Sequence, residues 1–467
     1  MKSKPEVSLV SKEPPSPAKA FWRDFPSAIR DPLEYLVRMA ELGSVVMMRK
    51  NRAYLVSEPS LIKYVLQDNH PNYRKGERYQ NALRPLFGAG LLTSEGDVWK
   101  RQRRLVQPAF KHRRHEQFAA AFEACTRTAL ERWRAAALAG RPIDIRDEMI
   151  RLTMSALMGA MFGRDTGLDV EKLGQAFLTA QHELNIAAVF SPVKIPAWFP
   201  TPGHIRFRRA LKEIDLFIAR LVEERRKLGP NENDIVSLLV YAKDEETGDC
   251  MSGTQLRDEI ITLLAAGHDT VTEALTWTLY LLAIHHDIQQ RLQEELDSVL
   301  AGGSRGIDDS TPTPYLDMVL QESMRLYPPI WGFLRTAIHE DQIGGFRIPA
   351  GARVILSPYV VHRSRQIWQH PSDFWPEHFS EKQTAERHRF SFFPFSAGPR
   401  QCIGVGFATL EMRIMVSLLV RNFKSEIVPG QTVRPLPRVS LKPDRSIYVH
   451  LTERIPKVIK AGVKPAV

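Results

Sequence analysis

Apolar residues recur at intervals of three and four positions over much of the 467-residue chain. This is the spacing of helices that bury one face against a core, so it predicts a mainly helical protein. The longest predicted helices cover residues 115–139, 145–162, 170–189, 204–228, 252–286, 313–327 and 405–421. A shorter helix is expected at 31–42, where Asp31 can cap the first turn and Pro32 follows it.

Few segments show the alternation that is typical of strands. Residues 45–48 and 53–56 predict one hairpin, residues 345–358 predict a second, and short strands are expected within 423–451. Residues 69–94 are irregular and rich in Gly, Pro and Arg, which predicts a long loop. The expected fold class is therefore mainly α with small β-sheets (α+β).

No linker, repeat or low-complexity tract divides the chain. One large domain is expected over residues 21–460, between a flexible N-terminus (1–20) and a tail (461–467). Its 43% hydrophobic residues suffice for a core that encloses a cofactor and a substrate.

A membrane anchor is not expected. Residues 1–20 lack the apolar run of a signal peptide or an anchor. The apolar segment 260–284 contains His268, Asp269 and Glu273, which favours a buried helix over a membrane span. Three widely spaced cysteines argue against a disulfide framework, so a cytoplasmic protein is expected.

The net charge of +11 is spread over many helices. No stripe of aromatic and basic residues and no known nucleic-acid module accompanies it, so a nucleic-acid partner is not expected. The charge can be a solvated surface or a docking face for an acidic electron-transfer protein.

Candidate chemistry gathers at residues 393–404. Gly398 and Gly404 let the backbone bend around Cys402, which precedes the predicted helix 405–421. Backbone N–H groups at a helix N-terminus favour a thiolate, and Arg400 can reach an acidic group on a flat ligand. A single sulfur ligand suits haem iron better than a four-ligand zinc site, although a buried structural cysteine is the alternative.

The pattern Phe395-x-x-Gly398-x-Arg400-x-Cys402-x-Gly404 resembles the haem-binding loop of the cytochromes P-450, the haem-thiolate monooxygenases. The resemblance spans nearly the whole chain. It implies the family's triangular helical body, with a long oxygen-binding helix over haem b (iron protoporphyrin IX). It also implies that Cys402 is the axial ligand of the iron.

Three further motifs follow the family's order. Trp99 and Arg103 share one face of a predicted helix, a spacing that also fits any amphipathic basic helix. They are similar to the family's Trp-x-x-x-Arg, which holds a haem propionate, and Arg335 stands where related sequences carry a second propionate contact.

The second motif is Ala265-Ala266-Gly267-His268-Asp269-Thr270. Polar groups inside an apolar helix need partners or a function. The segment resembles the family's oxygen-binding helix. There Ala266 and Gly267 would lie at the cofactor, Asp269 and Thr270 would relay protons to dioxygen, and Gly267 would permit a local distortion.

The third motif is Glu322-x-x-Arg325, whose family counterpart locks the loop beneath the haem. The family completes this network with an arginine, whereas this chain has His378. Histidine can still donate a hydrogen bond, but its charge depends on pH.

The resemblance also implies a substrate site of mostly apolar residues. Its candidates are Leu263, Ile330, Trp331, Gly332 and Phe333. A small hydrophobic substrate such as a fatty acid, terpenoid or steroid is expected.

Two further segments bear on the substrate. Arg74 and Lys75 can bind a carboxylate, which tilts the expectation slightly to fatty acids, or can be solvated surface charges. Residues 190–200 can form a rigid loop; the resemblance implies instead a roof over the substrate channel that can touch a membrane.

The activity implied is hydroxylation or epoxidation with dioxygen by a monomeric enzyme. The motifs use up the length of the chain, so two electrons are expected from NAD(P)H through a separate ferredoxin or flavodoxin and its reductase. The alternatives are a haem-thiolate peroxygenase, isomerase or gas sensor, and a haem-free helical binding protein. Asp269 and Thr270 favour dioxygen activation, and Cys402 with its Gly and Arg neighbours argues against the haem-free protein.

Overall fold

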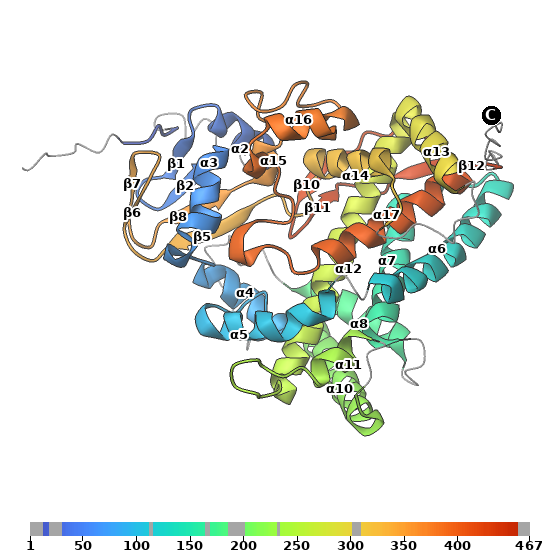
Figure 1. Ribbon diagram of the computed structural model, residues 1–467, viewed down its shortest axis with the longest axis horizontal. Helices are drawn as coiled ribbons and strands as arrows, with labels where there is room; N and C mark the ends of the chain where they lie inside the picture. Colours follow the sequence, from blue (N-terminus) through green and yellow to red (C-terminus); the bar gives the residue numbers. More distant parts are fainter. Residues whose placement is uncertain are drawn as a thin grey trace, which may run out of the picture. The chain divides into compact units, whose positions relative to one another are not determined.

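The computed structural model forms two compact units (Figure 1). Unit 1 comprises Met1–Gly76, Ile330–Asp373 and Glu381–Cys402, and unit 2 comprises Glu77–Pro329, Phe374–Ser380 and Ile403–Val467. The structure describes residues 13–17, 30–111, 115–163, 169–184, 201–230, 234–300 and 310–455. The segment 190–200 and the tail 461–467 lie outside these ranges. Within them, no helix has the length and apolarity needed to cross a membrane.

Unit 1 is built on a five-stranded sheet in the order β1-β2-β8-β5-β3. Its strands are β1 (Val45–Arg49), β2 (Ala53–Val56), β3 (Tyr73–Arg74), β5 (Phe333–Ala337) and β8 (Arg353–Leu356). The hairpin predicted at 45–56 is confirmed, because β1 and β2 pair antiparallel. Strand β8 pairs parallel to β2 and antiparallel to β5, so the centre of the sheet joins segments that are far apart in sequence.

The hairpin predicted at 345–358 is wrong. Both of its strands exist, but β7 (Phe346–Ile348) pairs with β6 (Asp341–Ile343) in a separate two-stranded sheet, while β8 joins the main sheet. Strand β8 alternates half-buried and buried residues, and β7 has the exposed Arg347 between two covered residues; such a pattern identifies a strand but not its pairing partner.

Short helices complete unit 1. They are α2 (Pro32–Ala40), α3 (Pro59–Lys63), the π-helical turn η1 (Tyr64–Asp68), the 3₁₀ turns η2 (His70–Asn72), η6 (Arg389–Ser391) and η7 (Gly398–Arg400), α15 (Pro358–Val361) and α16 (Glu381–Glu386). Asp31 caps α2 as predicted, because its carboxylate accepts a hydrogen bond from the Glu34 N–H at 3.0 Å.

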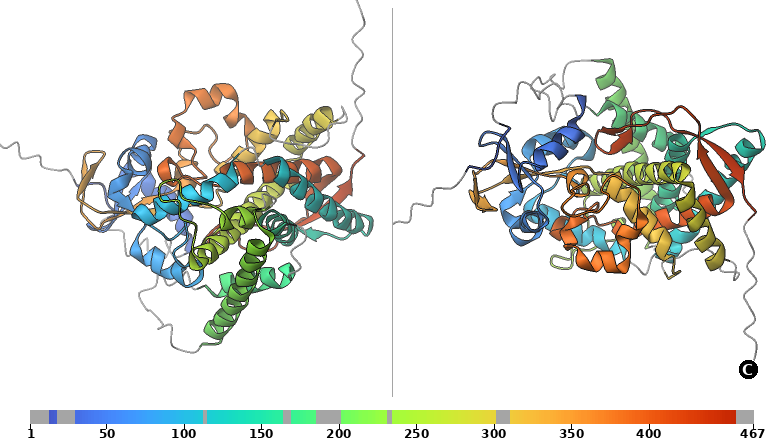
Figure 2. Two further views of the ribbon diagram at one scale, coloured as in Figure 1. Left: turned by 60° about the horizontal axis from the view of Figure 1, so that its bottom comes forward. Right: turned by 90° about the horizontal axis from the view of Figure 1, so that it is seen from above.

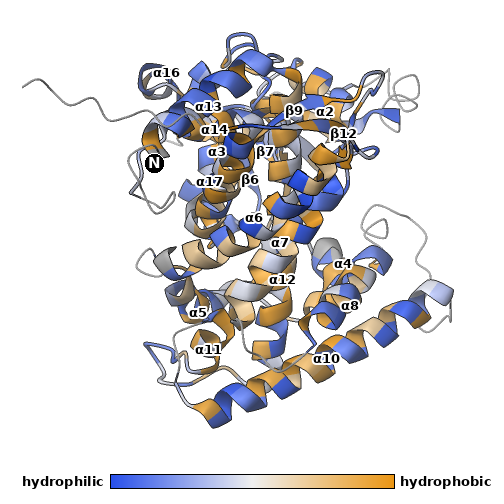
Figure 3. Cartoon of the chain, turned by 90° about the vertical axis from the view of Figure 1, so that its right-hand side faces the viewer, coloured by the Kyte–Doolittle hydropathy of each residue, from blue (hydrophilic) through white to orange (hydrophobic). Residues whose placement is uncertain are grey.

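Unit 2 is mainly helical. Its helices are α4 (Glu77–Phe87), α5 (Gly96–Val106), η3 (Gln107–Phe110), α6 (His115–Leu138), α7 (Ile145–Phe162), α8 (Val170–Glu183), α10 (Pro202–Leu228), α11 (Ile235–Val240), α12 (Gly253–Ile284), α13 (His286–Leu300), α14 (Pro314–Leu326), η5 (Pro376–Phe379) and α17 (Val405–Asn422). Apolar and polar residues alternate along the length of α10, so one of its faces is buried and the other is solvated (Figure 3).

Two small sheets belong to unit 2. Strand β12 (Tyr448–Glu453) lies between β4 (Ile143–Asp144) and β9 (Phe423–Ile427), and it packs beside α6 (Figure 2). Strands β10 (Pro435–Pro437) and β11 (Leu441–Pro443) form an antiparallel hairpin.

The long loop predicted at 69–94 is wrong in its middle, because residues 77–87 form α4. Leu83, Leu86 and Phe87 of this helix are buried at helical spacing. Pro85 lies inside the helix, where its missing N–H removes one hydrogen bond to the carbonyl four residues earlier. Burial of the apolar face therefore outweighs the Gly, Pro and Arg content on which the loop prediction rested.

Helix α12 is the central element of unit 2. Ser252 and Gln255 form a capping box at its start, with the Gln255 N–H 3.2 Å from the Ser252 hydroxyl. The helix packs against α7, α10, α14 and α17 and is buried along almost its whole length. A helix covered on all sides needs apolar residues on every face, which explains the membrane-like composition of its sequence, and buried polar residues such as Asp269 stand among them.

Candidate functional site

Cys402 is exposed at the end of a turn whose other residues are covered. From Ser391 to Leu410, Cys402 alone is exposed and every other residue is buried or half-buried. The Cys402 N–H donates a hydrogen bond to the Phe395 carbonyl at 3.0 Å, and the Gln401 N–H donates to the Gly398 carbonyl at 3.0 Å. These bonds fix the backbone, so the thiol is presented in a defined direction.

The turn needs glycine at position 398. Gly398 has φ +67°, and a Cβ there would lie 2.1 Å from the carbonyl oxygen of Leu66 in η1. No real Cβ comes this close to another atom, so η1 and η7 pack with their backbones in contact. Gly398 therefore allows the cysteine turn to pack closely against η1.

Three further predicted haem-binding residues of unit 1 lie in this turn or on the sheet. Phe395 and Arg400 are half-buried in the turn, and Arg335 is buried on β5, where its guanidinium donates to the Leu334 carbonyl at 3.0 Å. Sequence reasoning placed Arg335 only by its distance from Arg325.

The predicted substrate residues of unit 1 form one stretch, Ile330 to Phe333, which is half-buried. Its backbone is held because the Ser357 hydroxyl donates to the Trp331 carbonyl at 2.6 Å. The rings of Phe333 and Phe393 lie 6.3 Å apart, so this stretch contacts the residues that lead into the Cys402 turn. Leu263, the fifth predicted substrate residue, belongs to unit 2 and is buried on α12.

In unit 2, α5 brings Trp99 and Arg103 together as predicted. The guanidinium carbon of Arg103 lies 5.9 Å from the centre of the Trp99 ring, within the range of a cation–π contact. The buried Gln102 donates to the Ala89 carbonyl at 2.7 Å, which fixes α5 against the segment that precedes it.

Away from its two ends, helix α12 is covered except around Ala266. Between Leu256 and Ala283, Ala266 is the single exposed residue, and Gly267 and Thr270 beside it are half-buried. Ala266 and Thr270 are four residues apart and lie on one face, where the Thr270 hydroxyl donates to the Ala266 carbonyl at 2.7 Å. An exposed patch on an otherwise buried helix marks a surface that a ligand can cover.

Gly267 does not interrupt its helix, and the local distortion expected there stays a prediction. Helix α12 is unbroken from Gly253 to Ile284, and a Cβ at Gly267 would lie 2.9 Å from Cδ1 of Leu157 on α7. The small residue at this position therefore serves the packing of two helices.

Glu322 and Arg325 form a fully buried ion pair in α14. The guanidinium donates to both carboxylate oxygens, at 2.7 and 2.8 Å. His378 and the Trp375 N–H from the segment around η5 bond to the same carboxylate at 3.0 and 2.9 Å. Burial raises the pKa of Glu322, but the hydrogen bonds from Arg325 and His378 outweigh it and hold the pKa below its usual range. His378 thus occupies the third position of the predicted network.

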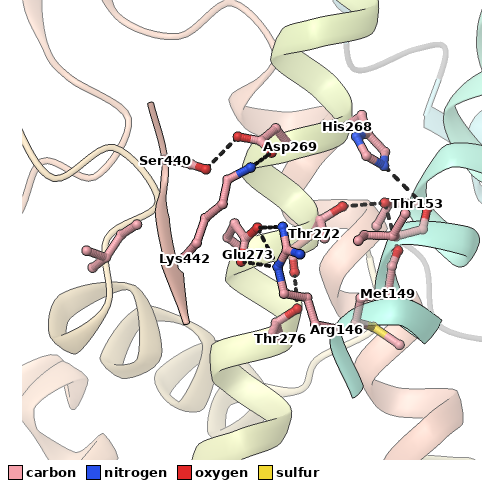
Figure 4. Close-up of polar contacts among 12 residues, drawn as sticks. Arg146, Met149, Thr153, His268, Asp269, Thr272, Glu273, Thr276, Ser440 and Lys442 are labelled. Atoms are coloured by element: carbon pink, nitrogen blue, oxygen red, sulfur yellow. Dashed lines mark hydrogen bonds and ion pairs between the residues drawn. The ribbon is translucent and has the colours of Figure 1, made fainter. Parts of the chain in front are cut away.

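Asp269 is buried and bonded to residues outside its helix (Figure 4). Its carboxylate accepts hydrogen bonds from the Ser440 hydroxyl and from the Lys442 ammonium, the latter at 2.8 Å. One turn further along α12, Glu273 pairs with Arg146 of α7 at 2.8 Å. Burial raises the pKa of Glu273, and Arg146 opposes this shift.

Sequence reasoning missed Arg146, Ser440 and Lys442. Glu273 carried a signal, because it follows Asp269 by four residues and must share its helix face. Nothing local in the sequence could identify the partners, since they come from segments more than a hundred residues away.

The donor set fits a haem. Unit 1 has an exposed thiol on a fixed turn and a buried arginine, and unit 2 has an exposed residue on a buried helix and an arginine beside Trp99 on α5; a thiolate-bound haem with acidic propionates requires such groups. They are observed separately in each unit.

Comparison with known proteins gives the same result. The family model for cytochrome P450 matches residues 35–450. Cyclooctatin synthase of Streptomyces melanosporofaciens is 32% identical over 415 residues, 88% of this chain and 89% of the relative. Pentalenene oxygenase of Streptomyces avermitilis is 29% identical over 431 residues, which is 92% and 94% of the two chains.

Solved structures confirm the expected fold class. The heme domain of cytochrome P450DA superposes with a TM-score of 0.82 at 22% sequence identity, over 96% of this chain and 99% of that chain. A mutant of the same domain gives a TM-score of 0.85. The chain therefore belongs to the cytochrome P450 family of monooxygenases.

Proposed function

We propose that this protein is a haem-thiolate monooxygenase that inserts one oxygen atom of dioxygen into a cyclic, terpenoid-like hydrophobic substrate. The observation that carries the proposal is the exposed thiol of Cys402 at the end of an otherwise covered turn. A structural cysteine in such a turn would be expected to be buried with its neighbours.

The haem-binding residues expected from the sequence would have separate parts. Cys402 would bind the iron, and the propionates would be neutralised by Trp99, Arg103, Arg335 and Arg400. When bound, the haem supplies the reductive activation of dioxygen and the transfer of one oxygen atom to the substrate.

The protein's own part is to position the substrate and to deliver protons. Ala266 and Gly267 leave a low surface on α12, so a small molecule can approach the helix there. Thr270 lies on the same face with its hydroxyl on the Ala266 carbonyl, and Asp269 follows on the buried side. Asp269 would hold a proton and Thr270 would pass it on, which is general acid catalysis by a carboxyl group through a hydroxyl.

The substrate class is supported by the relatives' activities and by the apolar residues. Cyclooctatin synthase, cyclooctat-9-en-7-ol 5-monooxygenase and pentalenene oxygenase are relatives that oxygenate terpenoids. The apolar character of Leu263, Ile330 and Phe333 suits a hydrocarbon ring system better than a charged substrate. Electrons would come from NAD(P)H through a ferredoxin or flavodoxin and its reductase.

Oxygen labelling tests the proposal. The haem-loaded protein is mixed with a ferredoxin, its reductase and NADPH under ¹⁸O₂, with cyclic diterpene alcohols and sesquiterpene hydrocarbons beside saturated fatty acids. We expect a cyclic terpene product with one ¹⁸O atom. Product that forms only with added hydrogen peroxide would instead identify a peroxygenase, and oxidation of fatty acids alone would contradict the substrate class.

A further inference from the structure

The carboxylate of Asp269 is oriented from outside its own helix. Ser440 and Lys442 come from the turn and the second strand of the β10–β11 hairpin, and they bind different oxygens of the carboxylate (Figure 4). Residues two apart on a strand point to the same side, so the hairpin presents both donors to α12 together. Asp269 is 7% exposed, so these contacts replace water.

The hairpin is itself fixed to unit 2 at the residue between the two donors. The Leu441 carbonyl accepts a hydrogen bond from the Trp277 indole at 2.8 Å, and the Leu441 N–H donates to the Pro329 carbonyl at 2.9 Å. Trp277 lies two turns after Asp269 on α12 and stacks on Tyr327 with ring centres 4.0 Å apart. The hairpin therefore meets α12 at two places, and the position of the donors is defined by buried groups.

Lys442 is the cation that is paired with Asp269. Arg146 also lies nearby, but its guanidinium is bound to Glu273 at 2.8 and 3.1 Å. His268 points to the Ile150 carbonyl, and burial lowers its pKa, which favours the neutral ring. The Lys442 side chain remains 26% exposed, so this ion pair lies close to solvent.

In this arrangement the proton relay is not connected. The Asp269 oxygens face the hairpin, while the Thr270 hydroxyl donates to the Ala266 carbonyl. A proton can pass from Asp269 toward Thr270 only if the carboxylate turns away from the hairpin. The strength of the Lys442 and Ser440 contacts thus decides how readily that happens and to which position the carboxylate returns.

We propose that Lys442 and Ser440 are positioning residues of proton delivery: they set the direction of the Asp269 carboxylate. This inference rests on the proposed function, because it concerns the relay used by that activity. Lys442, whose side chain is partly exposed, draws the carboxylate toward the hairpin by its charge, and Ser440 restores the carboxylate to one orientation after each transfer. Neither residue touches the reacting atoms.

The primary test is electron coupling in the holoenzyme. Both outcomes use two electrons and two protons. When proton delivery is misdirected, dioxygen is converted to hydrogen peroxide, whereas coupled turnover releases one oxygen atom as water and inserts the other into the substrate. For Lys442→Met we expect product per electron to fall about tenfold, with the deficit recovered as hydrogen peroxide and with KM unchanged. Lys442→Arg keeps the charge and should restore most of the coupling.

The control is Lys424→Met on β9, which removes a lysine from an exposed pair with Glu426 in the same unit and should leave coupling unchanged. A double variant distinguishes a role of Lys442 through Asp269 from a role in stabilising the fold. In the Asp269→Asn background, Lys442→Met should cause no further loss of coupling. A further loss, or wild-type coupling in Lys442→Met itself, would overturn the inference.

A second measurement does not depend on turnover. Hydrogen–deuterium exchange of the haem-loaded protein should be faster at residues 435–443 in Lys442→Met and Ser440→Ala than in the wild type, and unchanged in Lys424→Met. Unchanged exchange in both hairpin variants would contradict the positioning role. Suppose that the two hairpin variants exchange faster than the wild type, but that the wild type forms no oxygenated product with any electron donor. The proposed function would then fail, while the contact between the hairpin and Asp269 would still be supported.

Discussion

A buried charge is stable in this protein where donors surround it. Glu322 has an arginine, a histidine and a backbone N–H on its carboxylate. Glu411 on α17 is equally buried, but within the described part of the chain neither of its carboxylate oxygens has a hydrogen-bond partner. The two glutamates should therefore respond in opposite ways to pH and to replacement.

Glu322→Gln removes the negative charge that compensates Arg325. The guanidinium then remains fully buried beside a neutral amide, and we expect a loss of about 3–5 kcal/mol in the free energy of unfolding, measured by chemical denaturation. Glu223→Gln is the control, because Glu223 forms an i,i+4 pair with Lys227 on the exposed side of α10. Equal, small effects of the two substitutions would contradict a structural role for the buried network.

Glu411 should destabilise the protein as pH rises. Burial raises its pKa well above the usual value, so the folded chain keeps the proton while the unfolded chain ionises above about pH 4.3. The associated loss of stability has a slope of up to about 1.4 kcal/mol per pH unit until the folded group ionises. Glu411→Met should therefore raise the melting temperature more at pH 8 than at pH 5. If Glu411→Met changed the melting temperature by the same amount at both pH values, the raised pKa of Glu411 would be contradicted.

Residue types at fixed spacing allowed much of the site to be predicted. Cys402, Gly398 and the Glu322–Arg325 pair lie within short motifs, and the structure gives each a definite environment. The partners Ser440 and Lys442 could not be predicted, because their contact with Asp269 depends on where a distant hairpin packs.

At the scale of elements, backbone contact decides the geometry of the cysteine turn. In Gly398→Ala the new Cβ would clash with the Leu66 carbonyl oxygen. The positive φ at this position is also unfavourable for alanine. Gly345→Ala is a matched control in the same unit, since its φ is +83° but nothing lies within 4 Å of the new Cβ. The control should lose about 1–2 kcal/mol of stability through conformation alone.

Gly398→Ala should lose more stability than this control and should also bind haem more weakly, because η1 and η7 must separate. Haem titration followed by absorbance, together with thermal unfolding, measures both effects. Equal losses in the two variants would show that the close approach of the turn to η1 is unimportant.

The elements that could be predicted are those with a local cause. Helix α12 follows from apolar spacing and a capping box, and α7 matches its predicted range residue for residue. Helix α4 was missed because its composition suggested a loop, and the pairing of β7 was wrong because strand partners are chosen by tertiary packing.

At the scale of the whole molecule, the excess of positive charge suits an acidic electron donor. The net charge of +11 would raise the rate of encounter with an acidic ferredoxin and would be screened by salt. We expect the rate of reduction by such a ferredoxin to fall about tenfold between roughly 50 and 500 mM salt. Reduction by dithionite serves as the control, and an equal salt effect on both donors would argue against charge-driven docking.

The central claim is that Cys402 gives this fold a thiolate-bound haem. The most direct measurement is the carbon monoxide difference spectrum of the reduced, haem-loaded protein beside that of Cys402→Ala. We expect the wild type to show a strongly red-shifted Soret band, as thiolate ligation requires, and the variant to lack it. A wild-type protein that binds haem without that band, or a variant that retains it, would contradict the assignment of Cys402 and the monooxygenase function built on it.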